Sequence, residues 1–183
     1  MFETLLARLA RALADAAIPY MVIGGQAVLL YGAPRLTQDI DITLGVAPDR
    51  LTDVLDLLNA VSLRPLVDPE PFVAETLVLP CEDAETGIRI DLVFSYAGYE
   101  RTAMERVRSV EIQETPVLFT SVEDLVIQKL VAGRPRDLED VRGVLLRQPD
   151  VDVSYVRLWL REFDSALGLR TIQALDQTFL DLE

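Results

Sequence analysis

Two aspartates that stand two positions apart are the residues of this chain best placed to bind a cation. Asp39 and Asp41 lie in the strictly alternating run of residues 39–44, which predicts a β-strand. Residues i and i+2 of a strand point to the same face, with Cα atoms about 6.5 Å apart, so the two carboxylates repel each other unless a cation lies between them. Aspartate is also disfavoured in strands. The pair therefore indicates either a metal site or the solvated face of an edge strand.

A third aspartate, Asp91, lies in the apolar run of residues 88–94, which also predicts a strand. Its apolar neighbours place it in or near the core, where a carboxylate needs a partner or a metal ion. Two partners fit: a metal ion shared with the first two aspartates, or a salt bridge to an arginine such as Arg89.

Gly24 and Gly25 stand where a short apolar strand, residues 20–23, gives way to a helix over residues 26–32. Glycines let a backbone approach a ligand closely, and the first N–H groups of a helix bind phosphate. A purely structural glycine pair is the alternative. Taken with the aspartates, the pair indicates triphosphate chemistry, in which two metal ions roughly 4 Å apart are held by carboxylates on adjacent strands.

Composition narrows the chemistry further. The 183 residues include no histidine and one cysteine, Cys81, which excludes a histidine-based triad, a histidine general base, a histidine-ligated zinc ion and an internal disulfide. Any metal must be held by oxygen ligands, which favours Mg²⁺ or Mn²⁺. The formal net charge of −13 argues against broad, non-specific DNA binding.

The chain is expected to be cytoplasmic and to make no membrane contact. No apolar run reaches the roughly 18 residues that a membrane span needs. Arg8, Arg11 and Asp15 interrupt the apolar residues near the N-terminus, so this segment resembles an amphipathic helix rather than a signal peptide.

The elements that must position these residues alternate between helices and strands. Apolar periodicity predicts strands at 20–23, 39–44, 73–79, 88–94, 110–112 and 117–119, and three prolines predict a loop at 65–71. It predicts helices at 3–17, from Pro48, at 99–108, 121–132, 137–147, 153–166 and 170–181. The expected fold class is α+β, a mixed α/β arrangement in which helices pack on a mixed sheet. We expect a core domain at 1–120 and a helical C-terminal region packed on it at 121–183.

The run of residues 24–41 resembles the signature of DNA polymerase β-like nucleotidyltransferases, in which a Gly-Gly or Gly-Ser pair precedes Asp-x-Asp. Its Gly-x-x-Arg-x-Thr segment, residues 32–37, is similar to the minimal nucleotidyltransferases of the abortive-infection, type IV toxin kind. Residues 129–140 resemble the second motif of that branch, a helical lysine followed by Arg-x-Lys-Asp-x-x-Asp. The likeness spans roughly residues 20–140.

The resemblance implies a role for each matching residue. Three aspartates would be catalytic metal ligands: Asp39, Asp41 and Asp91. The nucleotide-binding residues would be Gly24, Gly25, Arg35, Thr37, Lys129, Asp137 and Asp140. Within that set Lys129 would reach the triphosphate, while the last two aspartates would lie near the nucleotide or pair with Arg134 and Arg136. Ordinary surface and loop chemistry is the alternative for this second motif.

Two positions depart from the family pattern. Gly25 replaces the serine of many relatives and removes one hydroxyl contact to phosphate. Arg136 stands where lysine is common, which keeps the charge but changes its geometry.

The resemblance implies a Mg²⁺-dependent nucleotidyltransferase that moves a nucleoside monophosphate from a nucleoside triphosphate to a hydroxyl of RNA, protein or a small molecule. Acceptors of the toxin kind would include tRNA or a protein, with a cognate antitoxin as partner. Two alternatives stay open: a non-catalytic nucleotide- or partner-binding module on the same fold, and a metal-dependent phosphohydrolase.

Overall fold

A computed structural model describes residues 1–95 and 98–182 of the chain. These residues form two compact units. The sheet unit comprises Met1–Gln26 and Thr37–Thr120, and the helical unit comprises Ala27–Leu36 and the chain from Ser121 onward. The chain therefore leaves the sheet unit after Gln26 and re-enters it at Thr37, two residues before the Asp-x-Asp pair.

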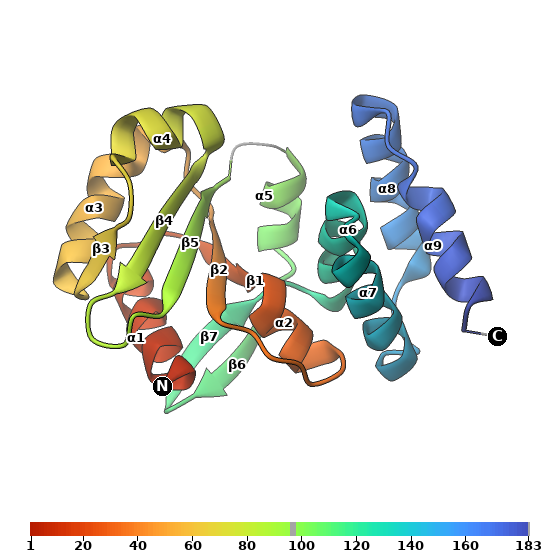
Figure 1. The fold of residues 1–183 in the computed structure, drawn as a ribbon, viewed down its shortest axis with the longest axis horizontal. Coiled ribbons are helices and arrows are strands. Elements are labelled where there is room, and N and C mark those ends of the chain that lie inside the picture. Colours follow the sequence, from red (N-terminus) through yellow and green to blue (C-terminus); the bar gives the residue numbers. More distant parts are fainter. Residues whose placement is uncertain (96–97, 183) are drawn as a thin grey trace. The chain divides into compact units, whose positions relative to one another are not determined.

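The sheet unit is built on one mixed seven-stranded sheet, with strand order β3-β4-β5-β2-β1-β7-β6. The strands are β1 (Tyr20–Ile23), β2 (Asp39–Leu44), β3 (Leu63–Pro65), β4 (Val78–Asp83), β5 (Arg89–Phe94), β6 (Arg108–Ile112) and β7 (Thr115–Phe119). The β1–β7 and β2–β5 pairs are parallel and the other neighbours are antiparallel (Figure 1). The expected mixed α/β fold class is therefore confirmed.

The central strands β2 and β5 follow the period-two alternation seen in the sequence. Six of their apolar side chains are at most 2% exposed and share one face: Ile40, Ile42, Leu44, Ile90, Leu92 and Phe94. Because successive strand residues point to opposite faces, Asp39, Asp41 and Asp91 all lie on the other face. Burial of the apolar face thus decides where the three carboxylates point.

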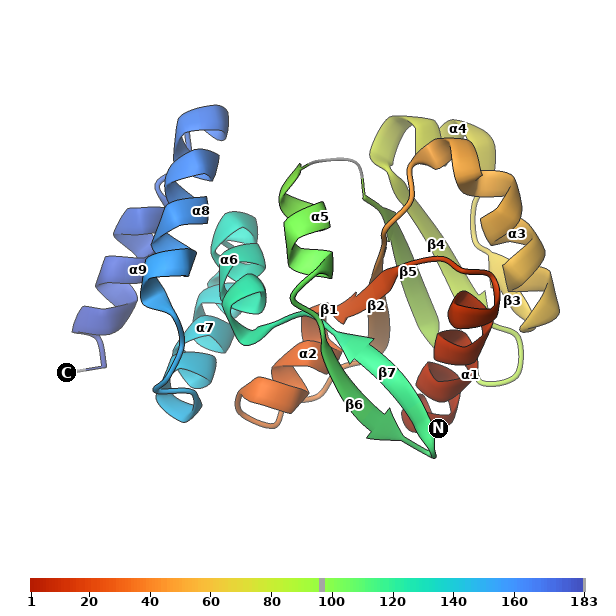
Figure 2. The same cartoon turned by 180° about the vertical axis from the view of Figure 1, so that it is seen from behind.

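The helical elements of the sheet unit are α1 (Phe2–Asp15), the 3₁₀ turn η1 (Pro48–Arg50), α3 (Leu51–Ala60), α4 (Pro69–Thr76) and α5 (Gly98–Met104). Of these, α1, α3 and α4 pack on strands. Helix α1 packs on β7 and β6 (Figure 2) and also contacts α3. Its leucine stripe is at most 3% exposed, as the helical spacing of Leu5, Leu6, Leu9 and Leu13 predicts.

Between residues 65 and 108, two predicted elements are wrong and one predicted helix ends early. The predicted strand 73–79 is divided between α4 and β4, and the predicted loop 65–71 holds the end of β3 and the start of α4. Proline fits the first turn of a helix, so Pro69 begins α4, and Leu77, in the left-handed region at φ 60°, ends it. The helix predicted over 99–108 ends at Met104, because residues from Arg108 onward pair with β7.

The helical unit contains α2 (Gly24–Tyr31) from Ala27 onward, α6 (Val122–Ala132), α7 (Pro135–Arg147), α8 (Val153–Leu167) and α9 (Thr171–Leu180). Helix α6 contacts α7, α8 and α9. The predicted N-cap of α6 is confirmed, since the Ser121 hydroxyl accepts a hydrogen bond from the Asp124 amide at 3.1 Å. A Cβ on Gly32 would lie 3.0 Å from Val144, so the end of α2 approaches α7 closely.

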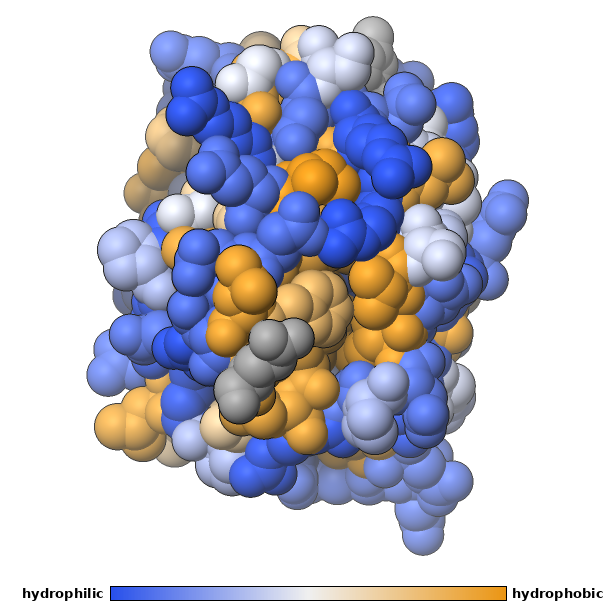
Figure 3. All heavy atoms as spheres, turned by 90° about the vertical axis from the view of Figure 1, so that its right-hand side faces the viewer, coloured by the Kyte–Doolittle hydropathy of each residue, from blue (hydrophilic) through white to orange (hydrophobic). Residues whose placement is uncertain are grey.

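Several leucines of the helical unit point outward. Leu146, Leu158, Leu167 and Leu180 are between 55% and 64% exposed. Figure 3 shows apolar side chains gathered on the face that carries the C-terminal helices. Of the helices in the described part of the chain, none is long and apolar enough to cross a membrane.

Candidate active site

Asp41 and Asp91 are direct neighbours across the parallel strands β2 and β5, whose register pairs their Cα atoms. Asp39 lies two residues before Asp41 and is paired with Arg89 in the same register. The register brings together the three carboxylates that the sequence singled out, although fifty positions separate Asp41 from Asp91. Their side chains are half-buried, with 24% of that of Asp91 exposed, so solvent ions can reach them.

Gly24 has no side chain, and the Asp41 carboxylate occupies the space that a side chain there would fill. A Cβ built on Gly24 would lie 1.9 Å from Asp41 Oδ2. Its φ of 61° also lies in the left-handed region that glycine tolerates best. Helix α2 begins at this residue, and Gly25 lies in its first turn. The start of a helix, with its N–H donors, is therefore beside a metal-ligand candidate, as the phosphate-binding interpretation requires.

Hydrogen bonds orient Asp39. The Thr37 hydroxyl donates to Asp39 Oδ1 at 3.0 Å. The Gln26 side-chain amide donates to the Asp39 backbone carbonyl at 3.3 Å. Sequence analysis missed Gln26, although its position directly after the glycine pair was a usable signal. Thr37 contacts the metal-ligand candidate, and its predicted contact with nucleotide stays a prediction.

Asp91 has an arginine partner on its own strand. Arg89 Nε lies 3.2 Å from Asp91 Oδ1, and 57% of the arginine side chain is exposed. The salt bridge considered from the sequence is thus present, in a setting open to water where such pairs are weak. A bound cation would compensate the charge of Asp91 more strongly than this arginine does.

The charge of Asp91 also affects the pKa of Cys81, which lies on the neighbouring strand β4. Burial, and secondarily the charge of Asp91, raises the pKa of the Cys81 thiol to about 12. The thiol is therefore neutral at physiological pH and is neither a nucleophile nor a thiolate metal ligand here.

The carboxylate face suits a hard cation in its chemistry. Asp39, Asp41 and Asp91 offer oxygen ligands, which Mg²⁺ and Mn²⁺ prefer, and the missing side chain at Gly24 leaves room for one of the carboxylates. Within residues 1–95 and 98–182, no three histidine, cysteine or acidic side chains converge closely enough to enclose an ion. Metal binding at this face therefore requires the carboxylates to turn toward a shared ion.

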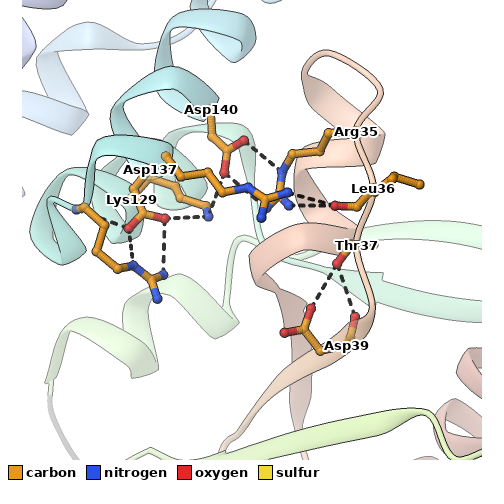
Figure 4. Close-up of polar contacts among 9 residues, drawn as sticks. Arg35, Leu36, Thr37, Asp39, Lys129, Asp137 and Asp140 are labelled. Carbon is orange, nitrogen blue, oxygen red and sulfur yellow. Dashed lines mark hydrogen bonds and ion pairs between the residues drawn. The ribbon is translucent and has the colours of Figure 1, made fainter.

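The second motif forms a separate cluster inside the helical unit (Figure 4). Lys129, only 7% exposed, places Nζ 2.8 Å from Asp137 Oδ1 and 2.9 Å from Asp140 Oδ2. Arg134 Nε donates to Asp137 Oδ2 at 2.6 Å. The predicted Arg134–Asp137 partnership is confirmed, and the lysine ammonium is held between two buried carboxylates.

Asp140 pairs with Arg35 and not with Arg136. Arg35 Nε lies 2.9 Å from Asp140 Oδ1, and a second guanidinium nitrogen lies 3.2 Å from Asp140 Oδ2. Arg35 and Arg136 instead share another acceptor, the backbone carbonyl of Leu36, at 3.2 and 2.9 Å. We name this set, Arg35, Lys129, Arg136 and Asp140, the loop clamp, because it holds the loop that precedes Thr37.

Asp137 is ionised despite its burial. Burial raises its pKa, but hydrogen bonds from Arg134 and Lys129 and their positive charges outweigh that effect, so the pKa is lowered. The carboxylate also accepts a hydrogen bond from the Arg134 backbone amide at the start of α7, where the helix dipole favours a negative charge.

A family model described as nucleotidyltransferase of unknown function (DUF6036) matches residues 3–167, most of the chain. The chain belongs to this nucleotidyltransferase family. A comparison with curated protein sequences finds no significant match. The family match confirms the resemblance to nucleotidyltransferases, and membership of the toxin-like branch stays a prediction.

Experimental structures of nucleotidyltransferases share the fold of this family member. The solution structure of the antibiotic-resistance factor ANT(2'')-Ia has a TM-score of 0.63 at 17% identity, over 91% of this chain and 94% of that one. Its crystal structure with adenylyl-2''-tobramycin gives 0.62 at 17% identity, over 89% and 97%. The lincomycin-bound lincosamide adenylyltransferase LnuA gives 0.51 at 16% identity, over 72% and 89%. At these identities the likeness shows the fold alone.

Proposed function

We propose that this protein is a metal-dependent enzyme that transfers a nucleoside monophosphate from a nucleoside triphosphate to an acceptor hydroxyl. The observation that carries the proposal is the register of β2 and β5, which sets Asp91 beside Asp41 on the face that also bears Asp39. Three aspartates on one face of two neighbouring strands concentrate negative charge, which a bound cation would offset.

Asp39, Asp41 and Asp91 hold Mg²⁺ or Mn²⁺ in this proposal. When bound, the metal neutralises triphosphate charge and lowers the pKa of the acceptor hydroxyl. The amides at the start of α2, around Gly24 and Gly25, bind phosphate oxygens. Asp91 accepts the proton of the attacking hydroxyl, whose oxygen bonds to the α-phosphorus as pyrophosphate leaves.

The acceptor is a hydroxyl of a small molecule, of RNA such as a tRNA 3′ end, or of a protein. Two of the similar structures, by their descriptions, contain an adenylylated antibiotic and a bound antibiotic, so small-molecule hydroxyls are the first class to test. Transfer to tRNA or protein would support a toxin role with a cognate antitoxin. We place the reaction in the cytoplasm, where nucleoside triphosphates and Mg²⁺ are abundant.

The test begins with calorimetric binding of the four ribonucleoside triphosphates, with and without Mg²⁺, to wild type and to the Asp39→Ala, Asp41→Ala double variant. We expect one or more triphosphates to bind only with Mg²⁺, and the double variant to lose that binding. Labelled triphosphate is then incubated with each acceptor class, and the labelled product identifies the acceptor.

Two results would redirect the proposal. Equal binding by the double variant, or binding that is indifferent to Mg²⁺, would favour a non-catalytic nucleotide- or partner-binding module. Release of free phosphate without any acceptor would favour a phosphohydrolase.

A further inference from the structure

We propose that Asp140 and Arg35 are positioning residues for Asp39. In this view the loop clamp fixes the backbone just before Thr37, and Thr37 in turn orients the Asp39 carboxylate. The inference rests on the proposed function, because it assigns these residues to the metal site rather than to the nucleotide.

The contacts of Lys129 favour an internal role for this cluster. Its ammonium is nearly enclosed and lies within 3 Å of carboxylate oxygens of Asp137 and Asp140. If the lysine moved away to reach a triphosphate, two carboxylates that are 2% and 6% exposed would lose a partner, which is costly inside a protein. The lysine is therefore better suited to hold Asp140 in place.

Because Lys129 holds Asp140 in place, the Asp140 carboxylate has a defined position in which it pairs with Arg35. One terminal nitrogen of the guanidinium donates to Asp140 Oδ2 at 3.2 Å, and Nε lies 2.9 Å from Asp140 Oδ1 as an ion-pair contact without hydrogen-bond geometry. The same guanidinium donates to the Leu36 carbonyl through its remaining terminal nitrogen. One arginine therefore joins the α7 carboxylate to the loop backbone.

The loop has little apolar packing to hold it otherwise. The Leu36 side chain is 87% exposed, so burial contributes almost nothing at this position. The backbone carbonyl of Leu36 instead accepts two hydrogen bonds from arginines. Polar contacts are thus what restrains the residue that precedes Thr37.

Thr37 links the restrained backbone of Leu36 to the Asp39 carboxylate. It follows Leu36 directly in the chain, and its hydroxyl bonds to Asp39 Oδ1. Groups that hydrogen-bond a metal ligand orient it, and their loss typically lowers metal affinity by roughly 10- to 100-fold.

The experiment measures Mn²⁺ affinity by electron paramagnetic resonance, at a temperature where circular dichroism shows each full-length variant folded. Thr37→Val is expected to weaken Mn²⁺ binding by roughly tenfold or more, whereas Thr37→Ser keeps the hydroxyl and the affinity. Asp140→Asn is expected to weaken Mn²⁺ binding by a smaller factor, because it acts on Asp39 through Arg35 and the loop backbone. Should Asp140→Asn fail to fold, Arg35→Lys replaces it, since it keeps the charge but loses the guanidinium that bonds both Asp140 and the Leu36 carbonyl.

Asp124→Asn is the matched control. Asp124 is a fully buried carboxylate of the same helical unit that accepts hydrogen bonds from Ser121 and Tyr155. Its loss should lower the melting temperature and leave Mn²⁺ affinity unchanged, which separates positioning from general destabilisation.

Steady-state kinetics provide the second readout. At saturating metal, Asp140→Asn should lower kcat and leave the KM for the triphosphate near the wild-type value. The inference would be overturned if Asp140→Asn bound Mn²⁺ with wild-type affinity, or if it raised the KM without changing metal affinity. The loop clamp would then be assigned to nucleotide binding. If the Asp39→Ala, Asp41→Ala double variant bound Mn²⁺ as tightly as wild type, the proposed function would be overturned, and the inference with it.

Discussion

The two carboxylate clusters of this protein differ in how their charge is balanced. On β2 and β5, three aspartates share one face of the sheet, and the ion pair that Asp91 makes with Arg89 is open to water. In the helical unit, Asp137 and Asp140 are buried and share Lys129, with Arg134 and Arg35 completing the pairs.

This difference indicates different uses. A cluster of carboxylates that is neutralised by lysine and arginine side chains keeps its geometry without a bound ion and is suited to position other residues. A cluster that concentrates negative charge on a partly exposed face gains stability from an external cation and is suited to bind one. Aspartate therefore has a structural role in the helical unit and, in the function proposed above, a metal-binding role on the sheet.

Replacing the two aspartates of β2 should abolish activity and leave the fold intact. We expect Asp39→Ala, Asp41→Ala to lower nucleotidyl transfer by about a thousandfold or more, because metal ions contribute several kcal/mol and each 1.36 kcal/mol is about tenfold in rate. The melting temperature without metal should stay the same or rise, since like charges are removed. Labelled-product assays and thermal melts measure both; a large loss of stability would show that these carboxylates are structural.

Breaking the buried cluster should instead cost stability. Lys129→Met leaves two buried carboxylates short of a cation and is expected to lower the free energy of unfolding by roughly 3–5 kcal/mol. Arg142→Gln is the control on the same unit, because Arg142 pairs with Asp181 in solvent, with 45% of its side chain exposed, and should cost about 0–1 kcal/mol. Urea unfolding measures both, and similar values for the two variants would contradict internal pairing of the lysine.

Gly24→Ala tests whether the Asp41 carboxylate needs the space at the start of α2. Gly87 also has a positive φ, of 70°, but nothing lies within 4 Å of a Cβ built there. Gly87→Ala should therefore cost only backbone strain, about 1–2 kcal/mol, while Gly24→Ala adds a steric cost of roughly 1–3 kcal/mol and weakens metal binding. Equal stability and equal Mn²⁺ affinity in the two variants would argue against close approach of the carboxylate.

A smaller effect is expected in the pH dependence of stability. The pKa of Asp137 is lowered in the folded state, so its contribution is present above the unfolded pKa of about 3.9 and is lost as the pH falls through the folded value. Asp137→Asn should therefore reduce the decline of the unfolding free energy below about pH 4. Asp83 and Asp164, whose pKa values are also lowered, keep part of that decline in the variant. An unchanged pH profile would show that the ion pairs do not stabilise the ionised form.

Local patterns in the sequence predicted much of the fold. The alternation around Asp39 and Asp91 specified two strands, and helical spacing specified α1 and the C-terminal helices, because these signals lie within one element. The segment 73–79 was misassigned because a short apolar run fits a strand or a helix equally well, and only pairing of Val78–Asp83 with β5 divides it.

The order of residues along the chain specifies which groups are available: three aspartates in strands, a glycine pair before a helix, no histidine, and a lysine and two aspartates in the second motif. Strand pairing and helix packing bring particular groups together. Pairing of β2 with β5 sets Asp41 beside Asp91, and packing of α7 on α6 sets Lys129 between two carboxylates. Strand register and buried ion pairs join residues far apart in the chain, so no local pattern could predict them.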